Sequence, residues 1–359
     1  MDQQEFFVFL LRETAKAGAS DLHIIANVPP ALRLHGEIAV LNVPALTPTQ
    51  LRNLIYGLLN SHQIEKLETD LELCFSRSFD NLGRFRITVY FHAASPELSI
   101  RRCADHIPAR EELGLPDFVD QLPERRQGLM LFTGPTGMGK TTSMHCLIDM
   151  INSSRRCKIV TIEDPVEYVH HKKKSLIVQQ EMRADVRSFG AALRHVLRQD
   201  PDVICVGEMR DLETIETALV AAETGHFVIA TLHTPNAAGT IDRIVSVFPA
   251  MQQNQIITQL ANALQGVITQ LLLPRADKRG RVLAAEVLIV NTAVRNCIRE
   301  RQIHQIDSVI QTSKRAGMQS MDASLFDLYE RGDITIDTAL AHTRDSQLFN
   351  SRKADLIRN

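Results

Sequence analysis

The residues with the clearest chemical meaning lie at positions 134–141, where the sequence is Gly-Pro-Thr-Gly-Met-Gly-Lys-Thr. This segment fits the phosphate-binding pattern G-x-x-x-x-G-K-[ST] at every defined position. Glycines let backbone N–H groups approach phosphate oxygens, because no Cβ stands in the way. Lys140 is expected to bind the β- and γ-phosphates of a nucleotide, and the Thr141 hydroxyl is expected to bind Mg²⁺. The predicted nucleotide contacts are Gly134, Pro135, Thr136, Gly137, Met138, Gly139, Lys140, Thr141 and Thr142.

Acidic residues follow two apolar segments, and a phosphate site needs carboxylates for its metal ion and water. Glu208 comes shortly after the apolar segment 203–206. It is predicted to coordinate Mg²⁺ or to polarise the attacking water, and the alternative is a surface glutamate in a loop. Glu163 ends the segment 158–163 and is favoured as an outer-sphere metal ligand or a water-positioning base. The acidic segment 163–167 alone is a weak signal for such a site, because Asp164-Pro165 is also typical of the start of a turn.

Two histidines flank the apolar segment 227–231. His233 follows its carboxyl end, on the side where ligands of parallel sheets bind, and is predicted to sense the γ-phosphate or to contact a neighbouring subunit. His226 precedes the segment and is interpreted as structural. A single histidine in a loop is usually polar surface, so the residue type alone does not establish a catalytic role.

These residues need a scaffold of parallel strands whose carboxyl ends meet at one edge. After Gly128 the sequence alternates short apolar segments with helical patterns, which indicates an α/β fold with a parallel sheet covered on both faces. Strands are expected at 129–133, 158–163, 203–206, 227–231 and 282–290. Before Gly128, period-two segments and amphipathic helical patterns predict a smaller α+β domain.

Changes in composition divide the chain into three parts. Residues 1–102 are predicted to form the N-terminal α+β domain. Residues 103–127 contain three prolines and acidic stretches, and are predicted to be a linker with a short helix. Residues 128–359 are predicted to form the α/β domain, with a helical C-terminal region.

The 359-residue chain has ordinary globular composition, with 44% hydrophobic and 23% charged residues. Its 40 Lys and Arg residues nearly balance 42 Asp and Glu residues, so no nucleic acid partner is expected. The apolar segment 6–11 is far too short to span a bilayer, and the first residues lack a cationic signal-peptide region. None of the six cysteines forms a C-x-x-C pair, which argues against a zinc knuckle. A cytoplasmic location is therefore expected.

Four segments in this order resemble the secretion ATPase superfamily, which powers type II secretion and type IV pili. The segments are 134–141 (Walker A), 163–167 (Asp box), 200–211 (Walker B) and 222–234 (His box). Further matches to family signatures lie at 18–23, 207–211 and 317–322. The segment 293–300, Ala-Val-Arg-Asn-Cys-Ile-Arg-Glu, is close to the A-I-R-N-L-I-R-E box associated with retraction. Within the superfamily the chain most resembles the pilus retraction ATPases.

The resemblance implies a PAS-like N-terminal domain joined to a RecA-like P-loop NTPase core, with ATP between the two domains. It also implies a homohexameric ring that associates peripherally with the inner face of the inner membrane. The implied partners are an inner-membrane pilus platform protein of the PilC type and a paralogous retraction ATPase. Arg84, Arg86 and Arg101 of the N-terminal domain are candidate arginine fingers, and a solvated basic face is the alternative. The segment 92–98 departs from the family, because it lacks the Arg-Gly usual in this hairpin.

The leading hypothesis is an ATPase motor that drives pilus retraction and twitching motility. A pilus-extension or type II secretion ATPase is the second hypothesis, with the same chemistry and the opposite output. Those relatives carry a longer N-terminal region and usually a four-cysteine zinc insertion, and both are missing here, which favours retraction. A third hypothesis is an accessory subunit that binds nucleotide without hydrolysing it. A RecA-like DNA motor is the least favoured.

Overall fold

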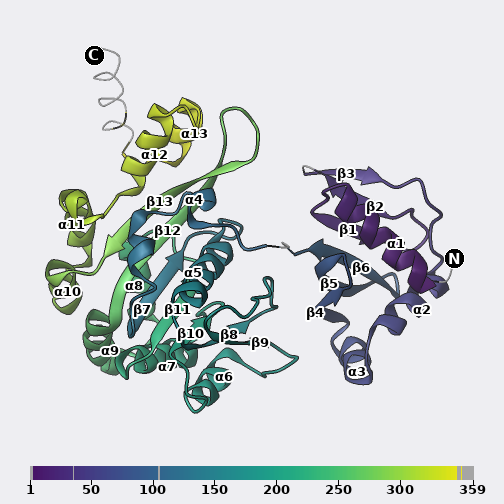
Figure 1. Ribbon diagram of the computed structural model, residues 1–359, viewed down its shortest axis with the longest axis horizontal. Coiled ribbons are helices and arrows are strands. Elements are labelled where there is room, and N and C mark those ends of the chain that lie inside the picture. The colour runs from purple at the N-terminus through teal and green to yellow at the C-terminus, as the bar shows by residue number, and fades with distance from the viewer. Residues whose placement is uncertain (1–2, 35, 104–105, 346–348, 350–359) are drawn as a thin grey trace. The chain divides into compact units, whose positions relative to one another are not determined.

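The computed structural model describes residues 3–34, 36–103, 106–345 and 349. The chain forms two compact units, whose elements are labelled in Figure 1. The first unit comprises Met1–His106 and Pro165–Val169, and the second comprises Ile107–Asp164 and His170–Asn359. The predicted domain boundaries and the likeness of the first unit to PAS domains stay predictions.

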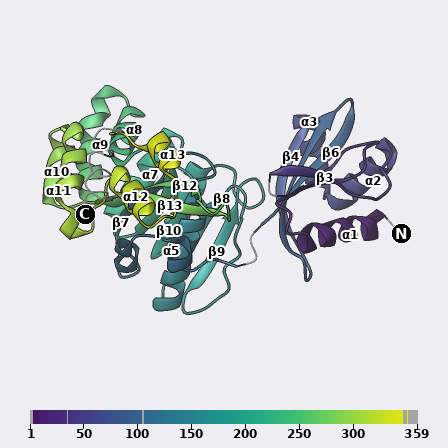
Figure 2. The ribbon, with the colours of Figure 1, turned by 90° about the horizontal axis from the view of Figure 1, so that it is seen from above.

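The first unit contains a six-stranded antiparallel sheet with strand order β3-β2-β1-β6-β5-β4. Its strands are β1 (Asp21–Ile24), β2 (Ala31–Leu34), β3 (Glu37–Val40), β4 (Glu72–Phe79), β5 (Gly83–His92) and β6 (Ser95–Arg102). Its helices are α1 (Gln3–Lys16), α2 (Pro48–Leu58) and α3 (Ser61–Asp70). Strand β5 alternates as its sequence predicts, because Phe85, Ile87 and Val89 are buried while the residues between them are partly exposed. Helices α1 and α2 pack against this sheet (Figure 2).

Capping residues fix where two of these helices begin. The Thr47 hydroxyl accepts a hydrogen bond from the backbone of Gln50, and the Gln50 side chain accepts one from the backbone of Thr47. Pro48 then occupies the first helical position of α2, where its missing N–H costs nothing. Asn60 and Gln63 form the same reciprocal pair at the start of α3.

The second unit contains a seven-stranded sheet with order β13-β12-β7-β11-β10-β8-β9. Its strands are β7 (Gly128–Thr133), β8 (Lys158–Glu163), β9 (Leu176–Glu181), β10 (Val203–Val206), β11 (Phe227–Leu232), β12 (Leu264–Pro274) and β13 (Arg281–Ile289). Its longer helices are α5 (Lys140–Ser154), α6 (Phe189–Val196), α7 (Leu212–Glu223), α8 (Ala237–Ser246), α9 (Ala250–Ala263), α10 (Thr292–Arg299) and α12 (Met321–Glu330). Its shorter helical segments are α4 (Arg110–Leu113), η1 (Asp117–Gln121), η2 (Ile303–Gln305), α11 (Ile306–Thr312), η3 (Lys314–Ala316) and α13 (Ile336–His342).

Apolar side chains on both faces of this sheet explain why its central strands are nearly continuous hydrophobic segments. On one face, alternate residues of the strands pack against α6, α7, α8, α9 and α10. On the other face, the intervening residues pack against α5 and η1. Phe118 and Val119 of η1 are buried there, although their segment was predicted as linker. The expected parallel sheet covered on both faces is thereby confirmed.

The predicted direction of one strand is wrong. The segment 282–290 was predicted within the parallel sheet, but β13 pairs antiparallel with β12 at the sheet edge. The two strands are joined by a short turn in which Lys278 and Gly280 have positive φ, and such a connection can only join antiparallel strands. In the part of the chain that the structure describes, no helix has the length and apolarity needed to span a bilayer.

Candidate active site

The phosphate loop, residues 134–139, connects the end of β7 to the start of α5. Gly134 is required at its position, because a Cβ there would lie 2.4 Å from the backbone oxygen of Gln270. Gly137 and Gly139 both have φ of +79°, a conformation that residues with a side chain rarely adopt. The cap residue of α5, Gly139, provides no side-chain hydrogen bond to the start of this helix, and the first backbone N–H groups of a helix are the groups that bind anions. These features favour phosphate binding at the loop.

Lys140 is the first residue of α5, and its side chain turns back over the phosphate loop. The Nζ atom donates hydrogen bonds to the backbone oxygens of Gly134 and Pro135, both at 2.8 Å. The residue is 6% exposed. Burial lowers the pKa of Lys140, and the nearby carboxylate of Glu208 opposes this shift. The ammonium is thus held above the loop that is expected to bind phosphate.

Three of the predicted site residues meet at the carboxyl edge of the sheet, because β7, β11 and β10 are adjacent parallel strands. His233 follows β11 and lies between the other two. Its Nδ1 atom is 3.4 Å from Lys140 Nζ, and its Nε2 atom is 3.4 Å from Glu208 Oε2. The Thr136 hydroxyl of the phosphate loop also lies 3.4 Å from His233 Nδ1. His226, by contrast, directly precedes β11 at the opposite end of the strand, and its Nδ1 atom contacts the backbone oxygen of Ala221.

Glu208 is also held by Arg210, a residue that was not predicted for the site. The Nε atom of Arg210 lies 2.6 Å from Glu208 Oε2, and the Glu208 side chain is 17% exposed. The carboxylate is therefore partly open to solvent and oriented from two sides, by Arg210 and by His233. A carboxylate in this setting can polarise a water molecule next to a bound phosphate.

The donor set near the loop fits a magnesium ion that is bound mainly through phosphates and water. In the described residues, no group of three or more His, Cys, Asp or Glu side chains is arranged to hold a metal ion. Mg²⁺ in phosphate-transfer sites typically takes one or two protein oxygens and completes its shell with phosphate and water. Thr141 and Glu208 offer such oxygens, and their predicted role as metal ligands stays a prediction.

Glu163 lies at the end of β8 and is buried, with only 3% of its side chain exposed. Its Oε1 atom accepts hydrogen bonds from the Thr161 hydroxyl at 2.5 Å and from Gln179 Nε2 at 3.0 Å. Its Oε2 atom lies 3.2 Å from His145 Nε2. Burial by itself would raise the pKa of Glu163, but His145 and the two hydrogen bonds outweigh it and lower the pKa. Glu163 is therefore kept ionised, while its role toward water stays a prediction.

His170 is the second histidine of this buried region. Its Nε2 atom lies 2.9 Å from His145 Nδ1, and the residue is 8% exposed. Burial, together with the neighbouring His145, lowers the pKa of His170 from 6.5 to about 4. At neutral pH the ring of His170 is therefore uncharged in the folded protein.

Replacement of His170 by Gln is expected to reduce the loss of stability in mild acid. The unfolded chain binds a proton at this residue near pH 6.5, whereas the folded protein binds it only near pH 4. Between these values the unfolded state takes up more protons, so this contribution to stability is complete above pH 6.5 and is lost as the pH falls toward 4. A shift of this size corresponds to roughly 3 kcal/mol at most. Urea unfolding of the wild type and the variant at pH 7.5 and pH 5 measures the difference.

The matched control is His304→Gln, which changes an exposed histidine of η2. This control is expected to keep the wild-type pH dependence. Equal losses of unfolding free energy between pH 7.5 and pH 5 in the wild type and in His170→Gln would contradict the prediction.

The three predicted arginine fingers lie in the first unit, each with a partner there. Arg84 Nε donates to the backbone oxygen of Val166 at 2.9 Å, and Arg84 also bonds the Ser76 hydroxyl. Arg86 Nε lies 3.3 Å from the sulfur of Cys74. Arg101 Nε donates to Asp21 Oδ1 at 2.8 Å. Their role as arginine fingers stays a prediction.

Strand β12 and its hairpin with β13 contribute contacts to the phosphate loop that sequence reasoning missed. The backbone N–H of Leu272 donates to the sulfur of Met138, and Arg281 donates to the backbone oxygen of Gly137 at 3.2 Å. Gln270 Nε2 donates to the hydroxyl of Ser143 in α5 at 2.7 Å. No motif marks these residues, and they become visible only once β12 is known to lie beside β7.

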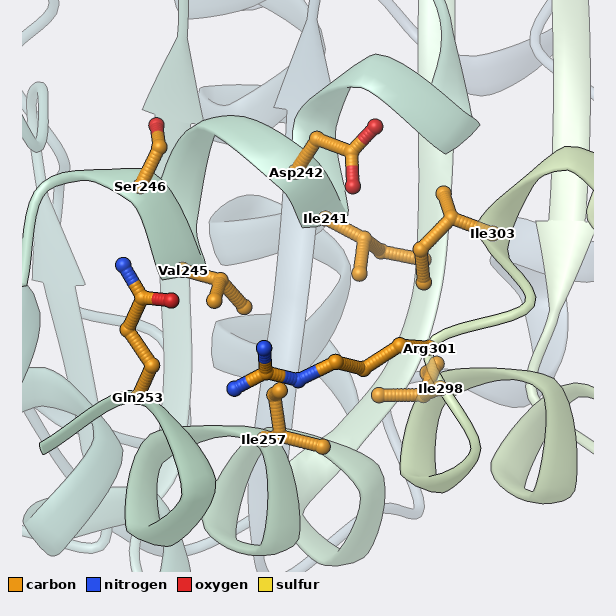
Figure 3. Close-up of a pocket in the computed structure, with 9 residues that line it drawn as sticks. All are labelled: Ile241, Asp242, Val245, Ser246, Gln253, Ile257, Ile298, Arg301 and Ile303. Atoms are coloured by element: carbon orange, nitrogen blue, oxygen red, sulfur yellow. The ribbon is translucent and has the colours of Figure 1, made fainter. Parts of the chain in front are cut away.

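A hollow of about 300 Å³ lies away from these residues, between α8, α9, α10 and η2. Figure 3 shows the guanidinium of Arg301 extending across it above Ile257. Its lining residues are Ile241, Asp242, Val245, Ser246, Gln253, Ile257, Ile298, Arg301 and Ile303. None of the predicted site residues lines it, so the hollow is separate from the phosphate loop.

Comparison with known proteins shows to which family the chain belongs. The family model described as "Type II/IV secretion system protein" matches residues 112–327, which is more than half of the chain. The chain belongs to this family. The resemblance to secretion ATPases that the four sequence segments indicated is thereby confirmed.

Relatives within the family match nearly the whole chain. The "Twitching motility protein" of Neisseria gonorrhoeae is 43% identical over 94% of this chain and 90% of its own length. The "Type IV pilus retractation ATPase PilT" of Pseudomonas aeruginosa is 43% identical over 92% of this chain and 96% of its own length. The crystal structure of the pilus retraction motor PilT with bound ADP is 46% identical, with a TM-score of 0.89, and covers 95% of this chain and 98% of that chain. The expected RecA-like ATPase fold with an N-terminal domain is confirmed.

Proposed function

We propose that the chain is a Mg²⁺-dependent, ATP-hydrolysing motor that drives type IV pilus retraction. The observation that carries the proposal is the contact series Lys140–His233–Glu208, which lies directly at a phosphate loop. It joins a phosphate-binding ammonium to a carboxylate that is partly open to solvent. The names of the two relatives that match nearly the whole chain support retraction as the output.

Each side chain has a defined task in this proposal. Lys140 and the N–H groups of the loop bind the β- and γ-phosphates. Mg²⁺, held by Thr141 and Glu208, would supply positive charge at the phosphates when bound. Glu208 polarises the attacking water, Glu163 positions it, and His233 links the phosphate side to Glu208. Arginines of the first unit, Arg84, Arg86 and Arg101, would stabilise the charge that develops on the γ-phosphate.

The proposal extends to the assembly in which the chain works. We expect a homohexamer at the cytoplasmic face of the inner membrane, acting on a platform protein of the pilus, alone or with a paralogous retraction ATPase. Family membership supports this assembly. Mass measurement of the purified protein with and without ATP tests the hexamer, and a monomer that hydrolyses ATP at the full rate would contradict it.

Deletion of the gene is expected to increase the number of surface pili and to abolish twitching motility. Without retraction, pili that have been extended stay on the surface. Electron microscopy of surface pili and a surface motility assay measure the two effects. Complementation with the wild-type gene is the control. Cells without pili would instead identify an extension motor, and a pure protein that binds ATP without turnover would identify an accessory subunit.

A further inference from the structure

Glu163 belongs to a closed ring of contacts that involves four segments of the second unit. His145 Nε2 lies 3.2 Å from Glu163 Oε2, and His145 Nδ1 lies 2.9 Å from His170 Nε2. The backbone N–H of His170 donates to Gln179 Oε1 at 2.9 Å. The ring closes where Gln179 Nε2 donates to Glu163 Oε1 at 3.0 Å. Helix α5, strand β8, strand β9 and the segment before β9 are therefore connected through this carboxylate.

Three of the four members of the ring are almost completely removed from solvent, and Gln179 is partly exposed. His145 is 0% exposed, Glu163 is 2% exposed and His170 is 8% exposed. Buried charges and ring nitrogens are costly unless they are paired. Nε2 of His145 and Oε2 of Glu163 form a close polar contact that does not meet hydrogen-bond geometry. A carboxylate only accepts, so this contact is favourable when Nε2 carries a hydrogen.

His145 also connects Glu163 to the phosphate loop. It lies in the second turn of α5, the helix whose first residue is Lys140. The same short stretch of helix therefore sets the position of the phosphate-binding ammonium and of the Glu163 carboxylate. Because both groups are positioned by the same helix, the Glu163 carboxylate is held at a fixed place relative to the phosphate loop. A carboxylate that orients a water molecule beside the γ-phosphate requires such a fixed position.

We propose that His145 is a positioning residue that orients the Glu163 carboxylate for hydrolysis, and that His170 fixes the ring of His145. The inference rests on the proposed function, in which Glu163 positions the attacking water. The groups that surround the carboxylate are consistent with it: Thr161 and Gln179 both donate to Oε1, whereas His145 faces Oε2, so neither takes the place of His145. Loss of His145 would leave burial as the dominant influence on the pKa of Glu163, and burial raises it.

The test compares three substitutions of His145 in the full-length protein. In Gln the side-chain amide nitrogen stands close to the place of Nε2, so His145→Gln keeps a donor toward Glu163. In Asn the amide stands close to the place of Nδ1, so His145→Asn keeps a partner for His170 and loses the donor toward Glu163. His145→Ala removes both. Steady-state kinetics give kcat and KM for ATP, and ADP binding is measured separately.

We expect His145→Ala and His145→Asn to lower kcat at least about tenfold, similar to the loss seen when a residue that orients a metal ligand is removed. KM for ATP and ADP affinity should change less than about twofold, because Lys140 and the loop are intact. His145→Gln should recover a large part of kcat. A purely structural role would affect Gln and Asn alike, and equal rates for these two variants would overturn the proposal. If His145→Ala does not fold, the comparison of His145→Gln with His145→Asn still tests the proposal.

Glu163→Gln separates this inference from the proposed function. If His145 acts through Glu163, adding His145→Ala to Glu163→Gln should lower kcat no further. An additional loss of the same size as in the wild-type background would overturn the proposal. Full activity of Glu163→Gln would also overturn it, whereas the ATPase function itself would still be judged by the variants of Lys140 and Glu208.

Discussion

Substitution of Lys140 by Ala is expected to abolish ATP hydrolysis and to weaken nucleotide binding. The Lys140 ammonium is 2.8 Å from two backbone oxygens of the phosphate loop, and it is a positive side chain held directly over that loop. Without it, charge that develops on the β- and γ-phosphates during cleavage loses its main protein partner. We expect a loss of about 10²–10³-fold in turnover. Phosphate release by the purified protein and binding of a fluorescent ATP analogue measure the two effects.

The matched control is Lys314→Ala, which removes an exposed lysine of η3. Its turnover should equal that of the wild type, because a single surface lysine contributes little to the fold. Thermal unfolding of both variants shows whether they remain folded. Continued ATP hydrolysis by a folded Lys140→Ala protein would refute the phosphate site proposed here, and with it the motor function.

The central strands could be predicted from the sequence because burial on both faces leaves a continuous apolar segment. Strands β8 and β10 have the predicted bounds, and β7 and β11 are each one residue longer. Strand β9 was missed because it lies at the sheet edge, where Leu176 is 57% exposed and polar residues follow. Strand β12 was missed because it begins directly after α9 with no connecting loop, and Gly266 comes only inside the strand.

Some of the candidate active-site residues could be predicted from the sequence to lie together, and others could not. Lys140, His233 and Glu208 could be predicted to lie together, because each follows or ends an apolar strand and parallel strands meet at one edge. The ring around Glu163 could not be predicted. His145 lies in the middle of a helix among apolar residues, and no sequence spacing relates it to residues 170 and 179. Only the pairing of β8 with β9 brings these side chains together.

Substitution of Glu208 by Gln is expected to stop hydrolysis while ATP still binds. The amide keeps the shape of the side chain and its contact with Arg210, but it removes the negative charge that faces His233 and the proposed metal ion. Binding depends mainly on the loop and Lys140, so affinity for ATP should stay within a few fold of the wild type. General-base and metal-orienting groups contribute about 10²–10⁴-fold, and kcat should fall by a similar factor. Single-turnover assays with radiolabelled ATP separate binding from cleavage.

Glu216→Gln is the matched control, because Glu216 is an exposed glutamate in α7. It should hydrolyse ATP at the wild-type rate. The contrast with Lys140→Ala is equally informative. Glu208→Gln should retain bound ATP, because Glu208 acts on the water. Lys140→Ala should lose ATP, because Lys140 binds the phosphates. Equal loss of ATP binding in both variants would mean that Glu208 supports the phosphate loop, through its contact with His233, rather than the cleavage step.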